Sequence, residues 1–359
     1  MKNLRRFRFV LVTIVFMVNL AASVEATSIS RYGYLEVDLP AGSDTYISIP
    51  FNNDIAAKGV LKSAPIMNAQ EGLVALAIAA ADVSWEEDEF KDLYYVRILD
   101  GDLEGLYFTV RSNSDDNLIV DDQGIDFSTV TSGTLFELAP YWTLETLFPS
   151  SSDTGLTASF GLSGRVRRSQ ILYPSLTGEG INLAPSRIFF FTSATGWLDA
   201  TSGFSDASNV ILYPDSYVIV RQPSSLADAK MLFRGAVNDE VLTLMFHTDA
   251  SSKQDNYVSL NRPNPVSLKD SGIASGFTDS TSFSGRGRRD ELLLFDNESQ
   301  TINKSPSKIF YTINGTWYSS ADRSVADDFL LMPSDCFIIR KWRDGGNTHF
   351  AKTYLSSGE

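Results

Sequence analysis

Short runs of β-branched and aromatic residues alternate with clusters of Gly, Pro, Asn, Asp and Ser along most of the chain. Apolar runs bounded at this spacing by turn-forming residues predict the strands of an all-β sandwich or barrel. Only residues 69–81, AQEGLVALAIAAA, have a helical composition. Because this run contains Gly72 and is apolar on every side, a buried strand pair explains it equally well. The runs are 34–39, 45–51, 94–99, 106–110, 117–120, 134–138, 187–191, 216–220, 241–246, 308–312 and 336–340.

The strand pattern contains an internal repeat. The segment NLAPSRIFFF (182–191) returns as NKSPSKIFYT (303–312) at an offset of 121 residues. The offset falls to 120 at Trp197 and Trp317 and to 119 at Arg221 and Arg340. Small deletions in polar stretches are what loops between paired strands tolerate. We therefore predict two related β-sandwich or β-barrel-like units that arose by internal duplication.

The repeat also suggests where the chain divides. A Pro-initiated strand occurs three times, at 39–51, 212–223 and 331–341. We place the first β unit at residues 27–224 and the second at 225–359. Residues 82–132 have no clear counterpart, so we interpret them as an insertion in the first unit. Within the insertion, 94–111 reads as a hairpin with its turn at Asp100-Gly101-Asp102.

Residues 1–26 are typical of a signal peptide. Four basic residues precede an apolar run, Phe9 to Leu20, and Val24-Glu25-Ala26 offers a cleavage site. The apolar run is shorter than the ~20 residues that span a bilayer, so we expect cleavage and no membrane insertion afterwards. These features predict export through the inner membrane, to the periplasm or the outside of the cell.

The charge of the chain excludes some partners. The formal charge is −14, and loss of residues 1–26 changes it to −17, because that segment holds four basic residues and one acidic residue. Such an acidic protein repels nucleic acid and anionic lipid. The lone Cys336 cannot form an intramolecular disulfide, and its place in an apolar run predicts a buried thiol.

Two groups of residues are candidates for binding. Arg165, Arg167 and Arg168, with their counterparts Arg286, Arg288 and Arg289, form dense positive charge that could recognise an anion or an acidic glycan. We favour the alternative that they lead into strands and pair with nearby carboxylates. Trp197 and Trp317 could stack on sugars, as in carbohydrate-binding modules. Burial in the core is the reading that we favour for both rings.

The sequence offers little for catalysis or metal binding. It has two histidines and neither a nucleophile elbow nor a zinc-binding helix, and we assign no catalytic, metal or cofactor residues. The run DGDLEG (100–105) has the spacing of a calcium loop, but its twelfth position is Arg111, where a bidentate glutamate is needed. Carboxylate pairs are too numerous for one to stand out as a glycosidase dyad.

The repeated Asn-x-x-Pro-Ser-x-Ile-Phe phrase is best explained as a fold determinant. Asn182 and Asn303 can form an Asx turn with their own backbone, and the following prolines favour entry into a strand at Ser186 and Ser307. Alternation then sends the Ile and Phe side chains to opposite faces of the strand.

Several linked phrases resemble a family of exported bacterial proteins that has no assigned activity. They are RRDELLLFDN (288–297), INKSPSKIFY (302–311), GTW (315–317) and FIIRK (337–341), with further matches over most of the chain. The resemblance implies export and a bacterial source, and it supplies no functional residues.

Signal peptide, acidic charge and repeated β units favour a non-enzymatic structural or adhesive component of the cell envelope or extracellular space. Its partners would be cell-surface polysaccharide or other envelope proteins. A polysaccharide-binding module that uses the tryptophans is the first alternative. An exported hydrolase with an unrecognised carboxylate pair is the second.

Overall fold

The computed structural model describes residues 31–68, 70–79, 85–150 and 154–353. The predicted signal peptide lies outside these residues. The fold is all-β, as the sequence predicts. The helical elements in the described part are one turn each, α1 (Leu144–Leu147) and the 3₁₀ turn η1 (Ile273–Gly276). Within the same ranges, no helix has the length and apolarity needed to cross a membrane.

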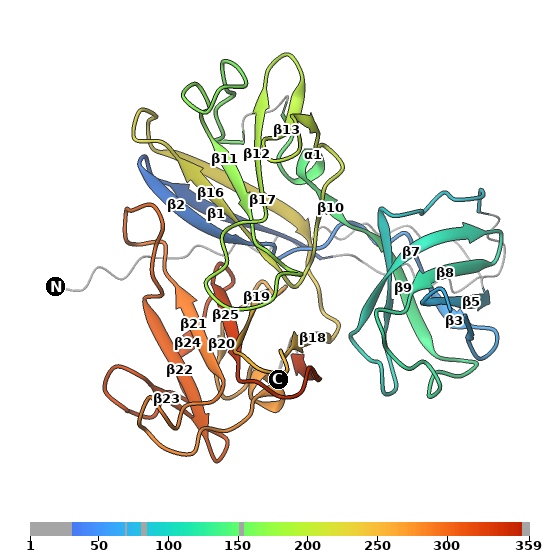
Figure 1. Ribbon diagram of the computed structural model, residues 1–359. Helices are drawn as coiled ribbons and strands as arrows, with labels where there is room; N and C mark the ends of the chain where they lie inside the picture. The colour runs from blue at the N-terminus through green and yellow to red at the C-terminus, as the bar shows by residue number, and fades with distance from the viewer. Residues whose placement is uncertain (1–30, 69, 80–84, 151–153, 354–359) are drawn as a thin grey trace, which may run out of the picture.

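The strands form three bodies (Figure 1). The first unit contains β1 (Tyr32–Leu39), β2 (Ser43–Ser48), β10 (Trp142–Thr143), β11 (Gln170–Tyr173), β12 (Arg187–Thr192), β13 (Gly196–Asp199), β14 (Ser205–Asp206), β15 (Ile211–Leu212), β16 (Tyr217–Gln222) and β17 (Ala229–Ala236). The second unit contains β18 (Leu242–His247), β19 (Gln254–Ser259), β20 (Val266–Ser267), β21 (Glu291–Phe295), β22 (Lys308–Ile313), β23 (Thr316–Ser319), β24 (Leu330–Leu331), β25 (Cys336–Lys341) and β26 (Thr348–Thr353). The third body contains β3 (Ala57–Leu61), β4 (Ile66–Asn68), β5 (Leu73–Ala79), β6 (Tyr94–Ile98), β7 (Tyr107–Ser114), β8 (Asn117–Asp121) and β9 (Leu135–Pro140).

The first and second units pair their strands in the same order. In the first, β2-β16-β11-β12-β13 form a sheet, and β1 pairs with β17. In the second, β19-β25-β21-β22-β23 form a sheet, and β18 pairs with β26. The minor pairs β10–β15 and β20–β24 correspond as well. Residues that correspond in the two sequence copies therefore lie on strands that occupy the same place in the pairing order. Descent of both units from one duplicated ancestor stays our hypothesis for this likeness.

The third body is a closed barrel. Its strands follow the order β3-β9-β6-β7-β8-β5, and pairing of β3 with β5 closes the ring, while β4 extends from the edge of β5. Residues 73–79, whose composition left helix and strand open, form strand β5, in which residues 73–77 pair with β8 and residues 78–79 with β3. The expected hairpin is present as β6 and β7, which pair in antiparallel register.

The strand pairing moves the predicted boundaries. The inserted body begins at β3 and ends at β9, and thus exceeds the predicted 82–132, because these two strands pair with each other inside the barrel. The first unit extends beyond residue 224 to Ala236, because β17 pairs with β1 over its whole length. The Pro-initiated phrase at 39–51 forms β2, whose position in the pairing order corresponds to β19.

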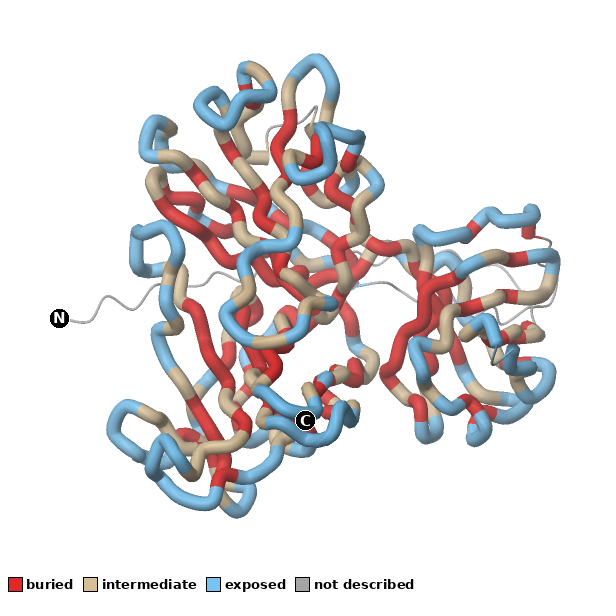
Figure 2. The backbone as a smooth tube through the Cα atoms, viewed as in Figure 1, coloured by how far each residue is buried: buried red, intermediate tan, exposed pale blue. Residues whose placement is uncertain are grey.

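Each body has its own apolar core, and Figure 2 shows buried residues running along the strands with exposed ones in the loops. Barrel and second unit share core residues, because Tyr95 and Tyr107 of the barrel, and Tyr141 directly after it, pack among Leu244, Phe337 and their neighbours. A separate buried cluster lies between the two units: Tyr46, Tyr217, Leu293, Phe295, Cys336 and Ile338. The barrel and both units are therefore joined through buried side chains.

Candidate functional site

The repeated asparagines bind the opposite unit. Asp44 on β2 and Arg221 on β16 form a bidentate ion pair within the first unit, with both N–O distances 2.7 Å. Asn303 of the second unit completes it. Its side-chain Oδ1 accepts from Arg221 Nη2 at 2.7 Å, and its backbone N donates to Asp44 Oδ2 at 2.7 Å.

The second unit repeats this arrangement with roles exchanged. Arg340 on β25 donates to Asp255 on β19 at 2.7 and 2.9 Å. Asn182 of the first unit accepts from Arg340 Nη2 at 2.8 Å and donates from its backbone to Asp255 Oδ2 at 2.8 Å. We call these six residues the inter-unit network.

The network explains why asparagine occurs twice in the repeated phrase. Asn182 and Asn303 have φ values of 56° and 52°, in the left-handed region that Asn tolerates better than most residues. The prediction was an Asx turn, in which the asparagine side chain bonds to its own backbone. Instead, each side-chain oxygen accepts a hydrogen bond from an arginine of the other unit. Asp44 and Asp255 are each 2 % exposed, so the two carboxylates are shielded from water, whereas the arginine–asparagine bonds are exposed.

The arginine clusters lead into strands, as predicted, but most of their contacts are with aromatic rings. Arg167 lies 4.8 Å from the centroid of the Phe190 ring, and its counterpart Arg288 lies 4.8 Å from that of Tyr311. Each guanidinium thus covers the outer face of its own sheet in a cation–π contact. Arg288 also lies 3.6 Å from Glu291, which agrees with the expected carboxylate partner at this position.

The other members of the clusters differ in exposure. Arg168 stacks on Phe160 at 4.1 Å, and Arg289 on Trp342 at 4.9 Å. Arg165 and Arg286 are exposed. The two clusters precede β11 and β21, which belong to different sheets, one in each unit.

The repeated tryptophans are core residues. Trp197 and Trp317 are both 0 % exposed. Trp197 Nε1 donates to the carbonyl oxygen of Phe148 at 2.9 Å, and the Trp317 ring packs edge-on against Phe277. A fully buried ring cannot stack on a sugar face, so the alternative of a glycan site built on these tryptophans is wrong.

Two further expectations concern single motifs. Cys336 is fully buried, as predicted, and burial raises the pKa of its thiol well above the usual value. In the DGDLEG turn, Asp100 accepts a hydrogen bond from the backbone N of Leu135, and Arg111 forms ion pairs with Asp92 and Asp121. Both acidic and basic side chains there therefore have structural partners. Within the described ranges, no group of three or more potential ligands is placed to hold a metal ion.

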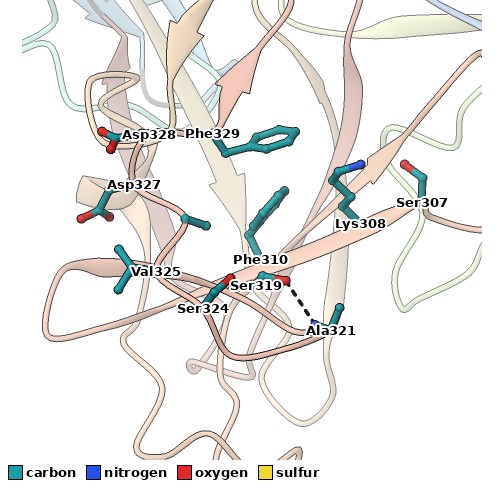
Figure 3. Close-up of a pocket in the computed structure, with 11 residues that line it drawn as sticks. Ser307, Lys308, Phe310, Ser319, Ala321, Ser324, Val325, Asp327, Asp328 and Phe329 are labelled. Carbon is teal, nitrogen blue, oxygen red and sulfur yellow. Dashed lines mark hydrogen bonds between the residues drawn. The ribbon is translucent and has the colours of Figure 1, made fainter. Parts of the chain in front are cut away.

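An open cavity of about 460 Å³ lies on the second unit, between β22, β23 and the loop that leads to β24. Its aromatic floor contains Phe310 and Phe329, whose ring centroids are 4.7 Å apart. Figure 3 shows Lys308 and Ser307 at one end and Asp327 and Asp328 at the other. The remaining lining residues are Ser319, Ala321, Ser324, Val325 and Ala326.

Sequence reasoning did not single out this cavity. One signal was present: the copies align Arg187 with Lys308 and Asp199 with Ser319, so a basic residue keeps its place while its acidic partner is lost. In the first unit Arg187 Nε donates to Asp199 Oδ2 at 2.7 Å. A search for charge pairs present in only one copy would have marked the position.

The chain was also compared with known proteins. No protein-family model matches it, and neither the curated proteins nor the solved structures contain a match.

Proposed function

We propose that the protein is a non-enzymatic structural or adhesive component that acts in the bacterial cell envelope or outside the cell. The observation that carries the proposal is that all three bodies are joined by buried contacts. The inter-unit network links the two units through both ion pairs, and the cluster around Tyr46 and Cys336 lies between them.

The barrel is hydrogen-bonded to both units. Tyr107 Oη donates to Asp215 of the first unit at 2.6 Å, and Thr243 of the second unit donates from its backbone N to the Gly105 carbonyl at 3.0 Å. Gly105 has a φ of +82°, and a Cβ there would lie 2.8 Å from the Thr243 N, so this contact requires glycine. Such contacts between the three bodies suit a structural or adhesive component, whose binding surfaces must keep their positions relative to one another.

The sequence features support the place of action. A signal peptide of residues 1–26 would carry the chain through the inner membrane, and the charge of −17 that remains favours solubility. Cell-surface polysaccharide and other envelope proteins are the partners that we propose. A resemblance to exported bacterial proteins agrees with this location.

Cell fractionation and gene deletion test the proposal. We expect the mature chain, beginning near Thr27, in the periplasmic, surface or medium fraction, and weaker surface attachment or envelope integrity in the deletion strain. Cytoplasmic retention of the uncleaved chain would contradict it. Depolymerisation of a polysaccharide by the purified protein would replace it with the hydrolase alternative.

A further inference from the structure

The cavity on the second unit lies where charged and aromatic residues differ between the two units. Strand registers align β12 and β13 with β22 and β23, and the loop that follows aligns through equivalent backbone bonds, Ala207 to Trp197 and Ala326 to Trp317. From the first unit to the second, the changes are Arg187 to Lys308, Asp199 to Ser319, Asp206 to Val325, Ser208 to Asp327, Asn209 to Asp328 and Val210 to Phe329.

These differences remove two carboxylates, Asp199 and Asp206, and add two others, Asp327 and Asp328, while the basic position keeps its charge. Arg187 is tied to Asp199 in the first unit, whereas no carboxylate of the described residues lies within ion-pair distance of Lys308. The Lys308 ammonium instead lies 5.7 Å from the centroid of the Phe329 ring. Asp327 uses Oδ1 to accept from the backbone N of Trp317 at 2.8 Å, and Asp328 is exposed at the rim.

We propose that this cavity binds a cationic amino-sugar unit of an extracellular polysaccharide, such as a glucosamine residue of a de-N-acetylated chain. The ammonium group would lie beside Asp327 and Asp328. An apolar face of the sugar ring would lie on the partly exposed Phe329, whose ring packs against the buried Phe310. Lys308 would donate to ring or glycosidic oxygens at the opposite end, as its separation from the carboxylates in Figure 3 allows.

Size and charge both favour this ligand class. A volume of about 460 Å³ lies in the range of ~300–1,000 Å³ typical of small-molecule sites. Two carboxylates against one ammonium give the cavity a net negative charge, which an acidic sugar would not complement. The hydroxyls of Ser307 and Ser324 donate to the Leu294 carbonyl and to Asp322, so their oxygens, with that of Ser319, remain as acceptors for sugar hydroxyls.

The proposal deepens the adhesive role proposed above, on which it rests, by naming what the protein would adhere to. Its test uses purified mature protein and therefore gives an answer that does not depend on cell location. Normal surface attachment together with failure to bind the sugar would reject the ligand assignment alone.

Calorimetric titration with two tetrasaccharides tests the ligand. The glucosamine tetramer and the N-acetylglucosamine tetramer share a backbone and differ in charge. We expect the cationic tetramer to bind at a single site with a Kd about tenfold or more below that of the neutral one, at an ionic strength that screens distant charges. Equal affinities, or no saturable binding of the cationic tetramer at millimolar concentration, would overturn the proposal.

Two variants separate the cavity from general attraction to an acidic protein. Ser319→Asp should recreate the ion pair of the first unit with Lys308 and weaken binding about tenfold, although it adds negative charge. Ser202→Asp, in the corresponding exposed turn of the first unit, is the control and should bind like the wild type. If general attraction to an acidic protein caused the binding, both variants should bind as tightly as the wild type or more tightly. Unchanged or tighter binding by Ser319→Asp would therefore reject the site.

A charge-removing pair completes the test. Asp328→Asn should weaken binding of the glucosamine tetramer, whereas Asp102→Asn, an exposed aspartate of the barrel, should not. Thermal melts of each variant establish that it is folded. Equal losses in the two variants would overturn the assignment of the ammonium to this end of the cavity.

Discussion

The two units place different chemistry in the same buried position. In the second unit Asp290 and Lys341, both 0 % exposed, form an ion pair. In the first, the aligned residues are Ser169 and Gln222, and the Ser169 hydroxyl donates to Gln222 Oε1 at 2.7 Å. One unit therefore buries two charges where the other buries a neutral pair.

The backbone surroundings of the two pairs are the same. Lys341 Nζ donates to the Gly276 carbonyl and Gln222 Nε2 to that of Gly155. The backbone N of Thr278 donates to Asp290, and that of Thr157 to Ser169. The shared fold thus places the same backbone donors and acceptors around this position in both units. The side chains determine whether the hydrogen bonds join charged or neutral groups.

Breaking the charged pair should have the largest effect. Asp290→Ala leaves the Lys341 ammonium buried without its carboxylate, so we expect the free energy of unfolding to fall by about 3 to 5 kcal/mol. Ser169→Ala removes two neutral bonds, to Gln222 and from the Thr157 backbone N, and should cost about 1 to 3 kcal/mol. Denaturant unfolding measures both. A larger loss for Ser169→Ala would mean that the charge is not what separates the units.

Exchanging the pair sharpens the comparison. The double variant Asp290→Ser with Lys341→Gln gives the second unit the neutral chemistry of the first. We expect it to be at least about 1 kcal/mol more stable than Asp290→Ala, because it leaves no unpaired ammonium buried. Burial already lowers the pKa of Lys341, in spite of the opposing effect of Asp290. A double variant no more stable than Asp290→Ala would show that the serine and glutamine do not form, in the second unit, the hydrogen bonds that Ser169 and Gln222 form in the first.

A second charge difference gives a pH dependence. Asp335 of the second unit aligns with Ser216 of the first, and burial raises the pKa of Asp335 from 3.8 to about 6. The folded protein then holds a proton that the unfolded chain releases between these values. This contribution to stability is complete below about pH 4 and is lost as the pH rises through 6.

Asp335→Asn should remove that pH-dependent part, which we place at roughly 1 to 3 kcal/mol. Melts between pH 4 and 7 of wild type and variant measure it. The variant should show a smaller decline in stability over this range, and parallel curves for the two proteins would contradict the assignment.

The inter-unit network should show the smallest effect and the closest agreement between units. Asn182→Ala and Asn303→Ala each remove one acceptor from an arginine, so we expect losses of about 0.5 to 2 kcal/mol that are equal within error. Both asparagines are exposed, and water can replace the missing acceptor. If both variants melted at the wild-type temperature, the two asparagine–arginine bonds would make no measurable contribution to stability.

Periodicity made the strands predictable. The apolar runs at 187–191 and 308–312 correspond to β12 and β22, and the interpretation of Trp197, Trp317 and Cys336 as core residues is correct. These features follow from local alternation and side-chain apolarity, which a single chain displays directly. The offset of 119 to 121 residues between the sequence copies likewise indicated that the first and second units would pair their strands in the same order.

Contacts between distant residues decided the rest. That β3 and β9 close one barrel, and that Asn182 reaches Arg340 while Asn303 reaches Arg221, depends on partners far apart in the chain. In the cavity, Ser319 stands where Asp199 pairs with Arg187, and only the strand register shows that this change leaves Lys308 without that partner. Sequence thus determined which segments are strands and which side chains are apolar, because those properties are local. Tertiary structure alone decided which charges meet, because ion pairing depends on distances of a few ångströms that strand order sets.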